Sequence, residues 1–303
     1  MKEDIYFLGI DGGGSHCRAR LESADGRLLG RGFGGPANPC YGLDLAMRSI
    51  EKAAAAALAD AGLPPGLMDR LRVGAGVAGL HLPRYRDAMC NASHPFEQLV
   101  LTDDLHIACL GAHGGGDGAV IIVGTGFSAL SVVDGVAHTI GAHGFMMGEA
   151  CSGAHIGFAA VNAALLAYDR LGQETLLAEL LGRELGGEGL MLANALAGAT
   201  ADRYAALAPV VFEAAERGDA VAGRILREAA AFIDRVAQRL LERDPPRLSL
   251  VGGIAERIVP WLAPDIAARL LPAEAPAEVG AIHLAREGIA PAPTSIPETG
   301  ISS

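Results

Sequence analysis

The sequence predicts an α/β protein built from two related domains that face each other across a cleft. In the first copy of a repeated pattern, residues 5–10 form a buried-strand run, the turn Asp11-Gly12-Gly13-Gly14-Ser15 follows, and residues 17–21 alternate as a second strand. In the second copy, residues 119–123 precede the turn Gly124-Thr125-Gly126 and another alternating strand. Each copy then reaches an Asp-Gly turn, so the order indicates an internal duplication.

Both glycine turns have the composition of phosphate-binding turns. Glycine lets the main chain approach an anion closely, so that successive N–H groups can converge on it, and Ser15 adds a hydroxyl. Asp11 would repel a bare phosphate at the same point, which favours a divalent cation, Mg²⁺, between the two. A single glycine triplet could also be an ordinary tight hairpin. The second copy of the pattern favours the interpretation as a phosphate-binding turn.

These motifs resemble those of the sugar kinase, Hsp70 and actin superfamily, and within it the BadF/BcrA-type ATPases and N-acetylglucosamine kinases. Residues 9–15 match the family's first phosphate motif and residues 122–126 its second. Further segments follow in the family's order, so that the resemblance covers about residues 4–290: residues 73–79, Thr102-Asp103-Asp104, residues 144–149, 250–253 and 279–281.

The resemblance implies two duplicated actin-like (ribonuclease H-like) ATPase domains with an interdomain cleft. We expect an N-terminal domain at residues 1–112, a C-terminal domain with a helical insertion at 113–280, and a returning helix and tail at 281–303. It also implies that ATP binds in the cleft, with Gly12 to Ser15 and Gly124 to Gly126 gripping its phosphates from opposite walls.

The composition excludes several classes of partner. The 303 residues carry a formal net charge of -11, with no run of Lys or Arg, which argues against nucleic acid and anionic membranes. The five cysteines form no C-x-x-C pair and suit reduced thiols in the cytoplasm. Residues 119–137 are mostly apolar or small, but Gly and Asp interrupt them, so no membrane span is predicted.

The rest of the first domain is expected to supply substrate contacts. After a third strand at residues 27–33, the loop holding Asn38 is either a turn or a ligand site, and the resemblance implies that Asn38 contacts sugar hydroxyls. A helix at residues 43–61 and a strand at 71–77 follow. Gly79 ends that strand where close approach of the domains, and of the substrate, is expected.

Asp103 and Asp104 follow the strand predicted at residues 98–102 and open the helix at 105–112. Carboxyl ends of strands line the ligand crevice of open α/β sheets, so both acids are candidates for catalysis. Either could instead cap the helix. The resemblance implies that Asp104 is the catalytic base, with Asp103 as its neighbour.

The glycine-rich segment 140–153 leads into a helix predicted at residues 154–171. His143 and Glu149 are its polar side chains, which a solvent-facing imidazole and a helix N-terminal acid would also explain. The resemblance implies that this loop, with His143, Gly144, Glu149 and the nearby Thr125, contacts a hexose. The chain has Glu-Ala at residues 149–150 where the family has Asp-Glu, which leaves the identity of the sugar open.

Residues 173–243 are mostly helical in pattern, with helices expected at 191–196, 204–215 and 221–241, and their work is structural or dimer-forming. A strand at 247–251 ends in Gly252-Gly253, which the resemblance implies holds the adenosine. Helices are expected at 254–268 and 279–287, and an untethered tail at 289–303.

The resemblance therefore implies an ATP-dependent kinase that phosphorylates glucosamine or N-acetylglucosamine at the 6-hydroxyl. The cysteines favour the cytoplasm, and the helical block at 173–243 is a candidate for forming a homodimer. Asp11 would hold Mg²⁺ largely through water, and Asp104 would accept the hydroxyl proton. One alternative is a BadF-type activator of a 2-hydroxyacyl-CoA dehydratase, which needs cysteines for an iron–sulfur cluster. The other is a sugar sensor that has lost catalysis.

Overall fold

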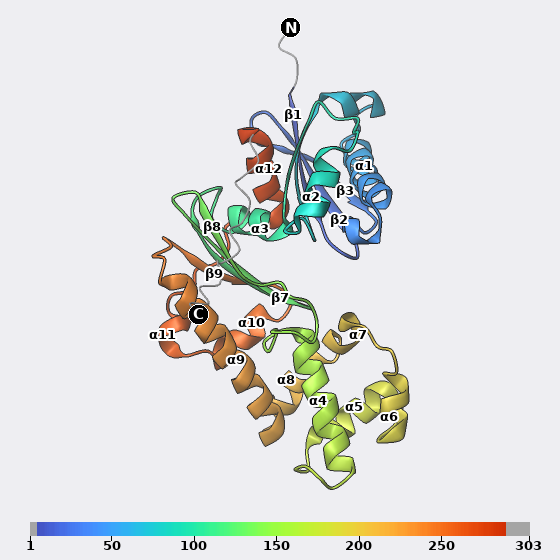
Figure 1. Cartoon of the computed structure of the whole chain (residues 1–303), viewed down its shortest axis with the longest axis vertical. Helices are drawn as coiled ribbons and strands as arrows, with labels where there is room; N and C mark the ends of the chain where they lie inside the picture. Colours follow the sequence, from blue (N-terminus) through green and yellow to red (C-terminus); the bar gives the residue numbers. More distant parts are fainter. Residues whose placement is uncertain (1–4, 289–303) are drawn as a thin grey trace, which may run out of the picture.

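The structure, a computed structural model that describes residues 5–288, has two lobes, each built on one β-sheet (Figure 1). The N-terminal lobe carries a five-stranded sheet and the C-terminal lobe a four-stranded one. The described residues contain no helix that is both long and apolar enough to span a bilayer. The tail predicted at residues 289–303 lies outside the described residues.

The first sheet has the order β3-β2-β1-β4-β5. Strands β1, β4 and β5 run parallel, and their register places Asp11, Gly76 and Thr102 side by side at the carboxyl ends of the strands. Asp103 and Asp104, which follow β5, therefore lie at the same end of the sheet as Asp11, with β4 between β5 and β1. The bounds of the strands are Tyr6–Gly12 for β1, Cys17–Ser23 for β2, Leu28–Gly34 for β3, Leu71–Val77 for β4 and Gln98–Thr102 for β5.

The second sheet repeats this arrangement with the order β8-β7-β6-β9. Its hairpin β6-β7-β8 is antiparallel and β9 pairs in parallel with β6, as β4 does with β1. An isolated parallel bridge between Leu248 and Leu270 stands in place of the fifth strand. The bounds are Gly118–Val123 for β6, Phe127–Val133 for β7, Val136–Gly141 for β8 and Leu248–Val251 for β9. The predicted duplication is confirmed by this shared order.

Helices cover the first sheet closely because glycines line its surface. A Cβ added to Gly32 of β3 would lie 2.0 Å from the Ala53 carbonyl oxygen of α1, and one added to Gly9 of β1 would lie 2.0 Å from the Glu278 carbonyl oxygen of α12. The helices of this lobe are α1 at Leu43–Asp60, α2 at Pro83–Cys90, α3 at Asp104–Ala112 and α12 at Ala277–Glu287, with 3-10 helices at Pro39–Tyr41 and Pro65–Arg70.

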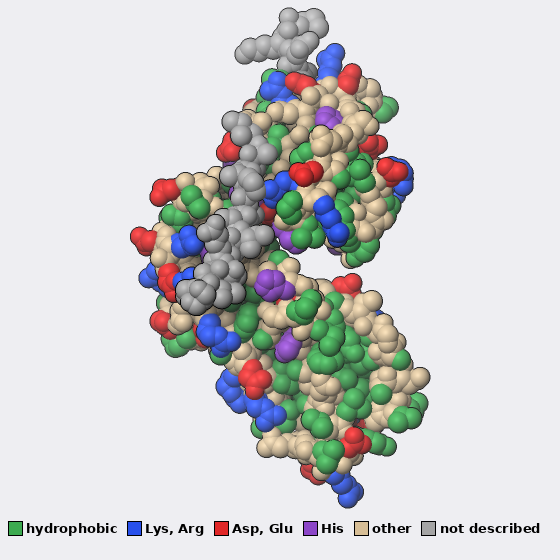
Figure 2. All heavy atoms as spheres, viewed as in Figure 1, with side chains coloured by type: hydrophobic (Ala, Val, Ile, Leu, Met, Phe, Trp, Pro, Cys, Tyr) green, Lys and Arg blue, Asp and Glu red, His purple; other side chains and the backbone are tan. Residues whose placement is uncertain are grey.

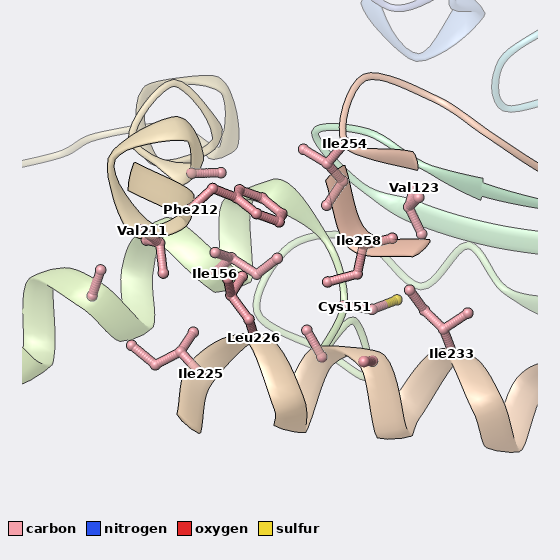
Figure 3. Close-up of a cluster of buried hydrophobic side chains, with 14 of the residues drawn as sticks. Val123, Cys151, Ile156, Val211, Phe212, Ile225, Leu226, Ile233, Ile254 and Ile258 are labelled. Atoms are coloured by element: carbon pink, nitrogen blue, oxygen red, sulfur yellow. The ribbon is translucent and has the colours of Figure 1, made fainter. Parts of the chain in front are cut away.

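The C-terminal lobe packs its helices into one apolar core (Figure 3). Phe212, Leu226 and Ile258 are buried there, together with Cys151. The helices are α4 at Gly153–Tyr168, α5 at Leu176–Leu185, α6 at Leu190–Ala195, α7 at Ala201–Ala205, α8 at Ala208–Glu216, α9 at Ala220–Leu241, α10 at Ala255–Ile258 and α11 at Pro264–Ala267, with a 3-10 turn at Val259–Trp261.

Two of the predicted helices were wrong because proline interrupts them. The helix predicted at 204–215 is divided between α7 and α8, and Pro209 lies in the first turn of α8. The helix predicted at 254–268 is three short pieces, and Pro260 and Pro264 each begin a new one. Proline lacks the N–H that continues a helix and clashes with the preceding turn, so it is accepted only near a helix start.

Within residues 5–288 the chain crosses between the lobes twice, at residues 113–117 and again at 272–276. Backbone bonds hold the second crossing to the end of α3, where Glu274 N donates to Ala112 O (3.1 Å) and Ala275 N to Gly111 O (3.0 Å). Helix α12 follows the second crossing and packs on the N-terminal sheet. The domain boundary predicted at residue 280 therefore falls inside α12, and the returning segment begins at Ala277.

Candidate active site

A cavity of about 610 Å³ lies between the two lobes, where Figure 2 shows the surface hollowed. Asn38, Gly79 and Asp104 line it from the N-terminal lobe, and Gly124 and Glu149 from the C-terminal lobe. The structure thus brings together predicted residues that are up to about a hundred positions apart in the sequence. A cavity with walls from two lobes can enclose a substrate and exclude water when the lobes approach.

The first glycine turn lies beside this cavity. The Gly12 carbonyl oxygen accepts a bond from Ala78 N (2.8 Å), and the Gly13 carbonyl oxygen accepts one from Ala37 N (3.0 Å). These bonds tie the turn to the two loops that carry Gly79 and Asn38. Gly14 and Ser15 are exposed, so their backbone groups can face a ligand. The turn itself does not line the cavity.

Asp11 is paired with an arginine that the sequence analysis did not single out. Its Oδ2 accepts a bond from the Arg18 guanidinium (2.6 Å), and Arg18 also lies 3.9 Å from Glu278 Oε1 on α12. The register of β1 and β2 sets Arg18 opposite Asp11. Any cation at Asp11 would therefore displace or share this arginine.

Asp103 and Asp104 divide the two roles that the sequence left open. The Asp103 carboxylate is buried and caps α3, accepting a bond from His106 N (2.8 Å). Asp104 is partly buried and lines the cavity. Burial, with the nearby charges of Asp103 and Asp11, raises the pKa of Asp104 to about 7. Asp104 is therefore suited to take up a proton near neutral pH.

Asn38 both shapes its loop and faces the cavity. Its Oδ1 accepts a bond from Cys40 N (2.9 Å), which caps the short helix at Pro39–Tyr41. Gly79 has a φ of 93° and packs against this amide, because an added Cβ would lie 2.8 Å from Asn38 Oδ1. The turn interpretation and the ligand interpretation of Asn38 are thus compatible.

The second glycine turn is joined to the start of α4. Gly153 N donates to the Gly124 carbonyl oxygen (2.8 Å), and Ala154 N donates to the Thr125 carbonyl oxygen (3.1 Å). A Cβ added to Gly124 would meet nothing within 4 Å, so open space lies in front of the turn. The N-terminal end of a helix carries partial positive charge. Because the first N–H groups of α4 are bonded within the turn, a phosphate in this open space would be favoured by the helix dipole and not by free N–H groups of α4.

Glu149 lies beside this turn and lines the cavity, with its carboxylate close to Gly126. The residue is 4% exposed, and its Oε1 accepts a bond from Gly144 N (3.1 Å). Its Oε2 is buried without a hydrogen-bond partner and lies 3.5 Å from the Cβ position of Gly126. Burial raises the pKa of this carboxyl. His143, by contrast, is exposed and does not line the cavity.

The predicted adenosine residues have different surroundings. Gly252 has a φ of 112°, and an added Cβ would lie 2.3 Å from the Val123 carbonyl oxygen, so the fold itself requires glycine there. Gly253 is exposed, and an added Cβ would meet nothing within 4 Å. Gly253 thus leaves an open surface next to β6, close to the second glycine turn.

Several lining residues were missed by the sequence analysis. Cys40, His81 and Tyr85 come from loops and from α2, where no motif marks them. Ser128 and Thr139 lie on β7 and β8. Only the packing of these segments against the glycine turns brings them to the cavity.

This arrangement agrees with the comparison of the chain with known families. The profile of the BadF/BadG/BcrA/BcrD ATPase family matches residues 8–283. The chain belongs to this family. The family resemblance predicted from the motifs is thereby confirmed.

Two relatives and two solved structures are similar to this chain over most of its length. The glucosamine kinase of Vibrio cholerae is 32% identical, over 92% of this chain and 95% of its own. The N-acetyl-D-glucosamine kinase of Dictyostelium discoideum is 28% identical, over 85% and 87%. A crystal structure from Chromobacterium violaceum, provisionally assigned as an N-acetylglucosamine kinase, has a TM-score of 0.87 at 29% identity, covering 93% of this chain and 99% of its own.

A glucokinase of the ROK family from Streptomyces griseus has a TM-score of 0.55 at 19% identity, covering 93% of this chain and 98% of its own. At that identity the similarity is one of fold. The predicted α/β architecture with two related domains is confirmed.

Proposed function

We propose that this protein transfers the γ-phosphoryl group of ATP to an amino sugar, glucosamine or N-acetylglucosamine, at its 6-hydroxyl. The observation that carries the proposal is Asp104, an acid with a pKa near 7 that faces the Gly124 turn across the cavity. The similarity to amino-sugar kinases over most of the chain supports the same substrate class.

Asp104 is the general base of the proposed reaction. It accepts the proton of the sugar hydroxyl as that oxygen attacks, and a base with a pKa near the working pH is the most effective one. A well-placed base contributes roughly 10²- to 10⁴-fold to the rate. The remainder of the catalysis is positioning and charge neutralisation, which the glycine turns and the start of α4 supply.

When bound, Mg²⁺ would neutralise the phosphate charges. Asp11, at the carboxyl end of the first sheet, suits a cation held largely through water. Among the described residues no group of three or more His, Cys, Asp or Glu is arranged to hold a metal. The nucleotide would therefore supply part of the coordination, and Arg18 would have to give way at Asp11.

The dehydratase-activator alternative is less favoured, because Cys151 lies in the core of the C-terminal lobe (Figure 3). It is fully buried, and burial raises the pKa of its thiol, which opposes the thiolate that an iron–sulfur cluster requires. The sensor alternative predicts binding without turnover. We also propose that the helical insertion forms a homodimer. The mass of the protein in solution tests this.

The activity is tested with ATP, Mg²⁺ and a small hexose panel in a coupled assay for ADP release. We expect ADP release with glucosamine or N-acetylglucosamine, and a product phosphorylated at the 6-position. Asp104→Asn should bind ATP normally and lose about 10²-fold or more in kcat. Full activity of this variant would remove Asp104 from the role, and sugar binding without ADP release would favour a sensor.

A further inference from the structure

The C-terminal wall of the cavity holds one buried polar atom, Glu149 Oε2, for which residues 5–288 supply no hydrogen bond of ordinary geometry. The Glu149 side chain is nearly fully buried. Its Oε1 accepts a bond from Gly144 N, and the Phe127 backbone, the Ser152 side chain and His143 lie close enough to favour its charged form. A buried carboxylate oxygen without a donor costs free energy, so a bound ligand that donates to it is favoured.

The charge of the cavity indicates which kind of ligand group would donate to Glu149 Oε2. Asp103, Asp104 and Glu149 line it, and its lining residues include no Lys or Arg. A neutral hydroxyl would satisfy the hydrogen bond and leave the negative charge uncompensated. A cationic donor would both make the hydrogen bond and compensate the negative charge. Hydrogen bonds to a charged partner are roughly twice as strong as neutral ones.

The position of Glu149 relative to Asp104 identifies which group of a hexose would meet it. Asp104 opens α3 in the N-terminal lobe, whereas Glu149 precedes α4 in the C-terminal lobe, so the two acids belong to opposite walls. In a hexopyranose ring, C2 is opposite C5, the atom that carries the 6-hydroxymethyl group. A sugar whose 6-hydroxyl faces Asp104 therefore directs its 2-substituent to the wall that holds Glu149.

We propose that Glu149 recognises the protonated 2-amino group of the sugar, and that the protein prefers the unacetylated 2-amino hexose to its N-acetyl form. This inference rests on the proposed sugar kinase function and names its substrate more narrowly. An acetamide carries no charge, and its added acyl group would have to fit between Glu149 and the packed Gly126 turn, where Oε2 already lies 3.5 Å from the Cβ position of Gly126.

The test measures sugar binding and turnover separately. Isothermal titration of the whole protein with glucosamine, N-acetylglucosamine and glucose, at a pH where the amine is protonated, should give the tightest binding for glucosamine, by about 10-fold or more. Glu149→Gln keeps the shape and removes the charge. It should weaken glucosamine binding about 30-fold or more and change N-acetylglucosamine binding by less than about 5-fold.

Glu184→Gln, an exposed acid on α5, is the matched control and should leave all three affinities unchanged. Circular dichroism and thermal melting of each variant establish that it is folded. Tighter binding of N-acetylglucosamine by the unmodified protein would overturn the inference, as would equal losses for both amino sugars in Glu149→Gln or the absence of sugar binding. Charge-dependent binding of glucosamine without ADP release from ATP would leave the inference standing and overturn the proposed kinase function.

Discussion

Two adjacent aspartates do different work at the start of α3. Asp103 satisfies a free N–H of the first helical turn, and Asp104 remains available to the cavity. The cap fixes the backbone of Asp104 and adds a negative charge beside it, which is one reason that the pKa of Asp104 is raised. The sequence could predict that one of the pair would cap and one would act, since both features depend on the strand-to-helix junction. It could not predict Arg18 at Asp11, because that pairing depends on the register of β1 and β2.

The raised pKa of Asp104 predicts a stability cost that depends on pH. The folded-state pKa is about 7 and the ordinary value 3.8, so ionisation of Asp104 disfavours the folded state. The cost is absent below pH 3.8, grows as the pH rises toward 7, and is complete above it. Asp104→Asn removes it, so the variant should be more stable than the unmodified protein by on the order of 2 kcal/mol at pH 8.

Melting temperatures between pH 5 and 9 measure this effect in the absence of ligands. The advantage of Asp104→Asn should increase from pH 5 to about 7 and level off above it. Asp87→Asn, an exposed acid on α2, is the control and should melt with the unmodified protein throughout. A pH-independent difference for Asp104→Asn would mean that the carboxyl titrates as an ordinary exposed acid, and would weaken its assignment as the base.

At the scale of elements, the two glycines of the turn after β9 differ. The fold requires Gly252, whereas Gly253 is open to a ligand. Gly252→Ala forces a side chain into the left-handed region and against the Val123 carbonyl oxygen, so it should destabilise the protein by roughly 2–4 kcal/mol. Gly253→Ala meets no atom within 4 Å and should melt normally. If Gly253 lies against the adenosine, the same change should raise the KM for ATP several-fold with little change in kcat.

These two variants are each other's controls. Chemical denaturation gives the free energy of unfolding, and initial rates at varied ATP give KM and kcat. A normal KM for ATP in a fully folded Gly253→Ala protein would move the adenosine away from this turn. Normal stability of Gly252→Ala would contradict the close packing of β9 against β6.

The sequence predicted elements well where one local pattern decides the conformation. Apolar strands followed by glycine-containing turns predicted β1, β4, β6 and β9 within a few residues, and the apolar run before Asp103 predicted β5, because buried strands leave nearly continuous apolar runs. The broken helix at 254–268 was missed although Pro260 and Pro264 mark its interruptions. Cavity residues such as His81 and Tyr85 carry no local pattern, since tertiary packing alone brings them to the site.

At the scale of the whole molecule, the two lobes form the walls of one cavity, and within residues 5–288 the chain crosses between them twice. Glu274 N and Ala275 N bind the end of α3 across these crossings, which ties the second crossing to the element that carries Asp104. A rotation about this point would change the width of the cavity while each sheet and its core remain intact. Ligands that contact both walls bind the closed form better and shift the population toward it.

Closure is therefore expected when both walls are occupied. Small-angle X-ray scattering should give a smaller radius of gyration with a non-hydrolysable ATP analogue, Mg²⁺ and an amino sugar together than with either ligand alone. Asp104→Asn should close as the unmodified protein does, because the role proposed for Asp104 is in proton transfer. Gly124→Val, which places a side chain in the open space before the second glycine turn, should remain open in the presence of both ligands. An unchanged radius of gyration at ligand concentrations shown by calorimetry to saturate the unmodified protein would mean that the cavity already has its catalytic width, and that exclusion of water must come from loop residues alone.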